Sequence, residues 1–207
     1  AHSSQQVLGR VQVGQTARGW GVGDRMVTMD RGWERALALG AEETVEELLR
    51  AGLRDRDYEN LSAGERMRCH TALCGPDKRI VCDCADVEPG VEVCRHLLAT
   101  NAASVMEGAV IAAFATGSTN VVFHTAEDDE AGADALEALA QEGVRVGGAE
   151  AESVRVEVVH APFRRNMKGY EDVPTLLMTG ETMLHVARIL GEGAEDYRNT
   201  GTAASPG

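Results

Sequence analysis

The segment RIVCDCADVEPGVEVCRHLLATNAASVMEGAVIAAFATGSTNVVFHTA, residues 79–126, decides the fold of this chain. It begins with RIVCDC, which is short, apolar at its start and followed by turn residues, a pattern typical of a buried strand. A long helix is predicted over residues 94–117, because apolar side chains form one broad stripe and Gly117 can end it. NVVFHTA is typical of a second strand. This order predicts a βαβ unit with parallel strands.

The segments on either side continue the alternation of helices and strands. Residues 31–52 predict two short helices, because Gly40 interrupts the helical pattern and Gly52 is a C-terminal stop signal. Residues 53–78 are polar and irregular, which predicts a loop. Further along, the predicted elements are an acidic helix at about 129–142, a strand at 153–161, a short apolar segment from Pro174 and a helix that begins near Glu181. The predicted fold is therefore α/β, a Rossmann-like, mainly parallel sheet flanked by helices.

The charge and composition of the chain indicate which partners and which locations to expect. The 207 residues carry a net charge of −13, from 33 acidic and 20 basic side chains. Phosphate backbones repel such a chain, so nucleic-acid binding is not expected. No apolar run approaches the roughly 20 residues that span a bilayer, and the first ten residues hold no apolar signal core. We expect one domain over residues 31–207, without membrane insertion, after a Gly-rich N-terminal extension of residues 1–30 that holds a short strand, RVQVG.

An ordered series of segments carries a family likeness. LLRAGLRDR, IVCDCADVEPG, the helix that contains Glu107 and Gly108, PTLLMTGETMLHVARIL and GEGAEDYRNTGTAASPG follow one another with consistent spacing. Residues 31–207 thereby resemble the flavin-binding domain of the flavoprotein (F) subunit of bacterial respiratory complex I, which also occurs in NAD-linked hydrogenases and formate dehydrogenases. The resemblance implies a domain that binds FMN, takes hydride from NADH and passes electrons to iron–sulfur clusters, among other protein subunits of a redox complex.

The resemblance also implies a set of cofactor-binding positions. The family's flavin loop, G-R-G-G-x-G-F-P-T-G, matches DRDYENLSAGE here, and its N-A-D-E-x-E matches the segment that starts at Asp83. The paired Asn residues before the family's E-T match Met178 and Thr179. The family-matched candidates for cofactor binding are Arg56, Asp83, Asp86, Glu88, Glu181 and Thr182.

Several of these regions depart from the family pattern. The glycines that let a backbone approach a phosphate are replaced by Asp55, Asp57, Tyr58 and Asn60. Two like charges about 4 Å apart repel by about 4 kcal/mol at an effective dielectric of 20, so each new carboxylate is expected to oppose the flavin phosphate. Ala85 replaces an Asp of the second motif.

Two family segments have no counterpart here. The segment with G-A-Y-x-C-G-E-E-T-A-L, which the family carries after its third strand, is missing between RVEVVHA and PFRRN. The cluster-bearing C-terminal domain is missing too, so the chain is expected to be a piece of a longer protein or a naturally short version. We therefore predict degenerate FMN and NADH sites and a mainly structural, partner-binding role. An active FMN-dependent NADH:acceptor oxidoreductase subunit with altered contacts is the first alternative.

The cysteines suggest a second alternative, a metal or iron–sulfur binding module. The candidate ligands are Cys69, Cys74, Cys82, Cys84 and Cys94. An odd number confined to one segment indicates a reduced, cytoplasmic setting. Cys82 and Cys84 are expected to share one face of a strand, and Cys94 is placed at a helix N-terminus, which can lower the pKa of a thiol. Buried core thiols, with the first two cysteines in a loop, and a redox disulfide are the other interpretations.

Overall fold

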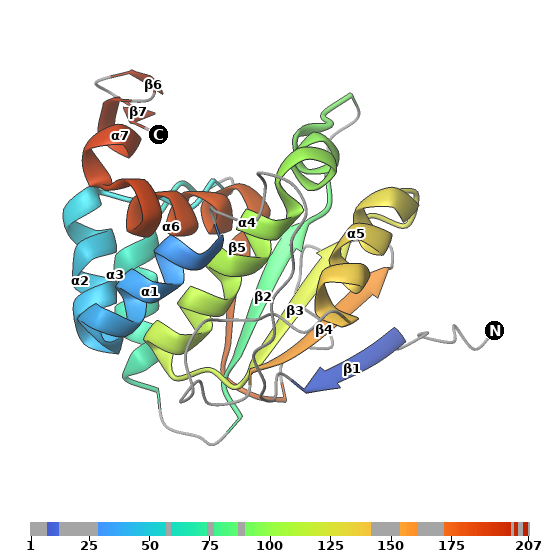
Figure 1. Cartoon of the computed structure of the whole chain (residues 1–207), viewed down its shortest axis with the longest axis horizontal. Helices are drawn as coiled ribbons and strands as arrows, with labels where there is room; N and C mark the ends of the chain where they lie inside the picture. Colours follow the sequence, from blue (N-terminus) through green and yellow to red (C-terminus); the bar gives the residue numbers. More distant parts are fainter. Residues whose placement is uncertain are drawn as a thin grey trace.

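The computed structural model describes residues 8–12, 29–56, 59–73, 77–86, 90–141, 154–160, 172–199, 201–202 and 205–206. Its centre is a five-stranded sheet with the order β1-β4-β3-β2-β5 (Figure 1). Strands β4, β3, β2 and β5 run parallel, while β1 is antiparallel to β4. The strands are β1 Leu8–Gln12, β2 Arg79–Cys84, β3 Asn120–Thr125, β4 Arg155–His160 and β5 Thr175–Thr179. The predicted α/β fold with a mainly parallel sheet is confirmed.

Helices occupy most of the chain between these strands. They are α1 Met29–Leu39, α2 Ala41–Ala51, α3 Ala63–Thr71, α4 Val93–Thr116, α5 Glu130–Gln141, α6 Gly180–Glu192 and α7 Ala194–Asn199, and a short pair, β6 Gly201–Thr202 and β7 Ser205–Pro206, follows. The predicted interruptions are confirmed, because Gly40, Gly52 and Gly117 have φ values of 81°, 77° and 67°. Gly52 and Gly117 end α2 and α4 in the left-handed conformation that favours glycine.

The described helices lie on one face of the sheet and beyond its β5 edge (Figure 1). Strand β2 shows the consequence, because Ile80, Cys82 and Cys84 are fully buried under α4 and α6. On the opposite face Arg79 and Asp83 are half-buried, while Val81 between them is buried. No described helix packs on that opposite face.

Helix α4 lies at the centre of the helical layer. An 18-residue window of α4 has a mean hydropathy of 1.5, so the helix is long and apolar enough to cross a membrane, which the sequence reasoning did not anticipate. In the fold, 67% of that window is buried against other elements, as expected for a core helix. A kink interrupts α4 at Asn101, where φ is −139° and ψ is 22°.

Helices α4 and α6 approach each other closely through their backbones. A Cβ atom added at Gly108 would lie 1.8 Å from the carbonyl oxygen of Met183. The two helix backbones therefore meet directly at this point, and only glycine fits. Glu107, the next residue, is buried and accepts a hydrogen bond from the backbone N–H of Trp33 at 3.1 Å, which ties α1 to the same crossing.

Helix α3 corrects the sequence-based prediction of an irregular region at 53–78. Ser62 caps the helix, since its hydroxyl accepts a hydrogen bond from the backbone N–H of Glu65 at 3.3 Å. The S-x-x-E spacing of a capping box was therefore present in the sequence, but the polar composition of the segment obscured it. Cys69, expected in a loop, lies in α3 and is exposed.

Strand β1 falls within the predicted N-terminal extension. It covers Leu8–Gln12 rather than RVQVG at 10–14, and Val11 is the register partner of Val156 in β4. Part of the extension therefore belongs to the same sheet as the main domain.

Candidate functional site

The family-matched residues that the structure describes gather where the parallel strands end, which is where ligands bind in open α/β sheets. Asp83 lies next to the last residue of β2, and Glu181 and Thr182 open α6 directly after β5. Arg56, in the loop between α2 and α3, donates its backbone N–H to the Thr182 hydroxyl at 3.0 Å. Its Nε lies 3.9 Å from Oε1 of Glu181. Three of the predicted residues are thus brought together from segments far apart in the sequence.

Asp55 also belongs to this group, in a role that differs from the prediction. Its carboxylate is fully buried, and Oδ1 accepts hydrogen bonds from the Thr179 backbone N–H at 3.1 Å, the Thr179 hydroxyl at 3.2 Å and the Thr182 hydroxyl at 2.7 Å. Oδ2 pairs with Nη1 of Arg66. This carboxylate is therefore paired inside the protein, whereas the sequence had led us to expect it to face a flavin phosphate directly. Asp57 and Tyr58 lie outside the described residues.

Arg66 and Thr179 were not among the predicted site residues. Arg66 lies in α3, and its Nη2 also donates to the carbonyl of Leu177 in β5 at 2.6 Å. Thr179 is the N-cap of α6. These contacts join residues more than 100 positions apart, as between Asp55 and Thr179, so no local sequence pattern could have indicated them.

Asp83 lies in an environment that disfavours its charge. Burial raises the pKa of its carboxyl to about 7, and the nearby carboxylates of Asp55 and Asp86 act in the same direction. The backbone N–H of Ala85 donates to Oδ1 at 3.0 Å and partly opposes this rise. The edge of the sheet therefore combines several acidic groups, and one of them titrates near neutral pH.

Asp86 caps helix α4. Its Oδ1 accepts the backbone N–H of Cys94 at 3.0 Å, and its Oδ2 accepts the backbone N–H of Arg95 at 3.1 Å. Both oxygens of this family-matched residue are thus engaged by the helix N-terminus, where a carboxylate is stabilised by the helix dipole. Glu88, the other candidate in this turn, lies outside the described residues.

Cys94 corrects a second prediction. Its pKa is raised rather than lowered, mainly by burial and then by the neighbouring Cys84 and by the charge of Asp86. The helix N-terminus cannot lower this pKa, because the negative charge of Asp86 already occupies it. A raised pKa keeps the thiol protonated and unreactive at neutral pH.

Cys82 and Cys84 share one face of β2, as predicted, and their sulfur atoms lie 3.6 Å apart. Both thiols are fully buried. Burial raises the pKa of Cys82, and the pKa of Cys84 is raised by its hydrogen bond with Cys82 and by burial. Within the described part of the chain, no three Cys, His, Asp or Glu side chains are placed to hold a metal ion. Cys69 is exposed on α3, and Cys74 lies outside the described residues.

Comparison with known proteins finds relatives among NAD-linked hydrogenases. No family model matches the chain. It is 29% identical over 208 residues to the alpha subunit of the NAD-reducing hydrogenase HoxS of Cupriavidus necator, a match that covers 84% of this chain and 34% of that subunit. Crystal structures of an NAD+-reducing [NiFe]-hydrogenase in the H2-reduced and air-oxidised states match 90% of this chain and 38% and 37% of theirs, with TM-scores of 0.74 and 0.69 and 22% identity.

The chain is thus similar to a subunit of an NAD-reducing hydrogenase and shares the fold of the hydrogenase structures. The predicted resemblance is confirmed, and the parallel sheet with its helices matches the hydrogenase fold. The chain spans about a third of the length of the relatives it matches.

Two residues that match the flavoprotein motif make contacts between helices. Glu107 and Gly108, which match the family's helix motif, make the contacts with Trp33 and with Met183 described above. The likeness at these positions follows from the packing of α4, and it carries no information about a bound cofactor.

Two neighbouring positions beside the candidate site both differ from the family motifs. In the motif N-A-D-E, Cys84 stands in the place of Ala, and in N-N-V-E-T, Gly180 stands in the place of Val. A Cβ atom added at Gly180 would lie 2.9 Å from the sulfur of Cys84. The thiol therefore takes space that a side chain at position 180 would need, so the two changes fit one another as core packing.

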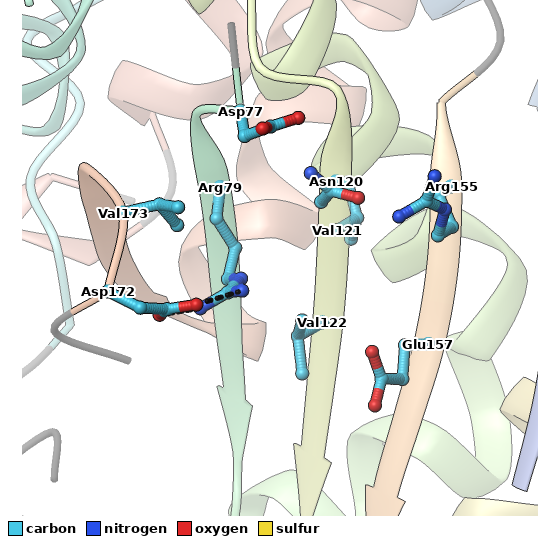
Figure 2. A pocket seen from close by; sticks show the side chains of 9 residues that line it. All are labelled: Asp77, Arg79, Asn120, Val121, Val122, Arg155, Glu157, Asp172 and Val173. Carbon is cyan, nitrogen blue, oxygen red and sulfur yellow. Dashed lines mark hydrogen bonds and ion pairs between the residues drawn. The ribbon is translucent and has the colours of Figure 1, made fainter. Parts of the chain in front are cut away.

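A separate hollow of about 240 Å³ lies on the face without described helices. Figure 2 shows its lining side chains on β2, β3 and β4 and in the segment before β5, with helices behind the sheet. Arg79 pairs with Asp172 across it at 3.0 Å. The hollow lies at the amino ends of the strands, away from the candidate site, and it contains none of the predicted residues.

Proposed function

We propose that this flavoprotein-like domain is a subunit of an NAD-linked electron-transfer assembly, with altered FMN and NADH sites and a mainly structural, partner-binding role. Its homology to a hydrogenase subunit supports the assignment to such an assembly. Other protein subunits are its partners, in the cytoplasm, and residues 31–207 form its domain. The net charge of −13 supports protein partners over nucleic acid.

The single observation that carries this proposal is the buried carboxylate of Asp55. It takes up the hydroxyl groups of Thr179 and Thr182 and the guanidinium of Arg66, which are donors that a phosphate would otherwise use. The side chains present here therefore do not fit a phosphate-bearing flavin in the family manner.

The charge of the surrounding residues supports the same conclusion. Asp83 and Asp86 stand near Asp55, and their mutual repulsion contributes to the raised pKa of Asp83. A dianionic phosphate brought to this edge would add further negative charge in a partly buried environment. Binding there would thus cost electrostatic free energy that the family's glycine loop does not impose.

The test is the flavin content of the purified chain after incubation with excess FMN and removal of the unbound cofactor. We expect no stoichiometric flavin absorbance in the visible spectrum and no NADH oxidation with an artificial electron acceptor. The variant Arg56→Ala, at the edge of the sheet, is compared with Arg50→Ala, whose exposed side chain pairs with Glu43 and Glu47 on α2.

Stoichiometric flavin in the unmodified chain and in Arg50→Ala, with loss in Arg56→Ala, would refute the proposal. It would favour the active FMN-dependent NADH:acceptor oxidoreductase instead. Arg56 is the informative position, because it lies beside Glu181 and Thr182 and is the one residue retained from the start of the flavin loop.

A further inference from the structure

The hollow on the face of the sheet without described helices has a lining of mixed charge. We call it the sheet hollow. Its volume of about 240 Å³ is below the roughly 300–1,000 Å³ that is usual for pockets of drug-sized molecules. It therefore has room for a small metabolite, and its charged side chains indicate which kind.

The strand register places the side chains of the sheet hollow in two rows. Arg79, Asn120 and Arg155 are partners across β2, β3 and β4, and Val122 and Glu157 form the next row on β3 and β4. All five share one face, because side chains alternate along a strand. Rows on one face lie two residues apart, so Glu157 begins about 6.7 Å from Arg155 along β4.

Arg155 and Glu157 differ from the other ion-pairing groups of the sheet hollow. Arg79 has a carboxylate partner, since it pairs with Asp172 at 3.0 Å. Among the residues that the structure describes, neither Arg155 nor Glu157 forms an ion pair, although they are two positions apart on one strand. Figure 2 shows both side chains at the sheet hollow. One positive and one negative group thus face the same small space without pairing with each other.

The neighbours of these two groups complete a small binding surface. The amide of Asn120 donates one hydrogen to the Thr119 hydroxyl at 3.1 Å and has a second one left. Together with the guanidinium of Arg155 it suits a carboxylate, while the carboxylate of Glu157 suits an ammonium group. Val122 is only 3% exposed and supplies an apolar floor.

We propose that the sheet hollow binds a small zwitterion of the α-amino acid class, with its carboxylate at Arg155 and Asn120 and its ammonium group at Glu157. Such a molecule carries both charges close together, so one ligand satisfies both side chains, whereas a simple anion or cation leaves one of them unmatched. The inference goes beyond the proposed function, because the sheet hollow lies at the amino ends of the strands and the candidate site at their carboxyl ends.

The experiment titrates the isotope-labelled chain with three probes of matched skeleton and follows the amide chemical shifts at constant ionic strength. L-Alanine carries both charges, propionate lacks the ammonium group, and ethylammonium lacks the carboxylate. Arg155→Gln and Glu157→Gln each remove one charge and keep a polar side chain. Arg188→Gln and Glu192→Gln are the matched controls, because both side chains are exposed on α6 and neither lines the sheet hollow.

We expect saturable binding of L-alanine, with propionate and ethylammonium bound at least about tenfold more weakly, since each lacks one charge-assisted contact. Arg155→Gln and Glu157→Gln should each weaken the binding of L-alanine by about tenfold or more, for the same reason. Arg188→Gln and Glu192→Gln should bind it as the unmodified chain does.

Three results would overturn the proposal: no saturable shifts with L-alanine, a single-charge probe that binds as tightly as L-alanine, or L-alanine binding that Arg155→Gln and Glu157→Gln leave unchanged. If a variant does not fold, the comparison of the three probes on the unmodified chain decides. The outcome is independent of the flavin test, because that test concerns the opposite ends of the strands.

Discussion

The contact between α4 and α6 makes a strong prediction for Gly108→Ala. The added Cβ would lie 1.8 Å from the carbonyl oxygen of Met183, 2.6 Å from its carbonyl carbon and 3.2 Å from its Cα. All three atoms belong to the backbone of a helix, so no side-chain rotation can relieve the clash. Ordinary contact between carbon and oxygen would require the helices to part by roughly 1.5 Å.

The expected cost follows from what lies around this contact. Val105, Met106, Ala109, Met183 and Val186 are fully buried beside it, so separation of the helices loosens a close-packed part of the core. Overpacking of this kind costs about 1–3 kcal/mol and at times more, whereas the better helix propensity of alanine returns about 1 kcal/mol. Because the clash is with backbone, we expect a net loss of about 2 kcal/mol in the free energy of unfolding, or a fall in Tm of about 4–8 °C.

The assay is urea denaturation and thermal unfolding followed by circular dichroism. Gly191→Ala is the matched control on α6, since its added Cβ would meet nothing closer than the backbone nitrogen of Gly32 at 3.6 Å. That variant should be neutral or gain up to about 1 kcal/mol from helix propensity. A Gly108→Ala protein as stable as Gly191→Ala would show that the two helices can separate without cost, and the packing argument would be wrong.

Two further predictions concern the carboxyl edge of the sheet. The folded-state pKa of Asp83, about 7, lies above its ordinary value of 3.8, so its protonated form is favoured by folding and stability is lost as pH rises toward 7. Asp83→Asn should therefore gain about 1–2 kcal/mol over the unmodified chain between about pH 5.5 and pH 8, and an equal difference at both pH values in urea denaturation would contradict this. In a Cys74→Ser background, a thiol reagent should modify Cys69 in the native protein and reach Cys82, Cys84 and Cys94 only after unfolding; rapid native labelling of all four would show that the cluster is open.

The sequence predicted those parts of the fold that depend on local signals. Gly40, Gly52 and Gly117 adopt positive φ values, and each marked a helix boundary correctly. The strand–helix–strand order of residues 79–126 predicted a parallel pair because the handedness and length of such a connection leave few alternatives. Helix α3 was missed although its Ser62 cap was readable, since low apolar content outweighed a valid start signal.

The candidate site was less predictable, because its chemistry depends on distant contacts. The resemblance placed Arg56, Glu181 and Thr182 in one site, and the structure has them close together, while their part in cofactor binding stays a prediction. It gave no indication that Asp55 turns inward to Arg66, or that Asp86 places its charge at the start of α4. The sequence shows that both side chains are acidic. Whether each charge opposes a ligand or is neutralised depends on its partner, which the sequence does not show.

The positions that match the family motifs and those that differ from them can both be compared with their packing in the structure. Glu107 and Gly108 match the family motif and lie where α4 meets α1 and α6, so packing alone accounts for them. Cys84 and Gly180 differ from the motif together and fit one another in space. Asp55 differs from the motif and completes a buried network. Under the proposed structural role, such altered positions with internal partners would keep the domain stable without a cofactor. The packing of α4 against α6 should therefore respond to Gly108→Ala whether or not a flavin is bound.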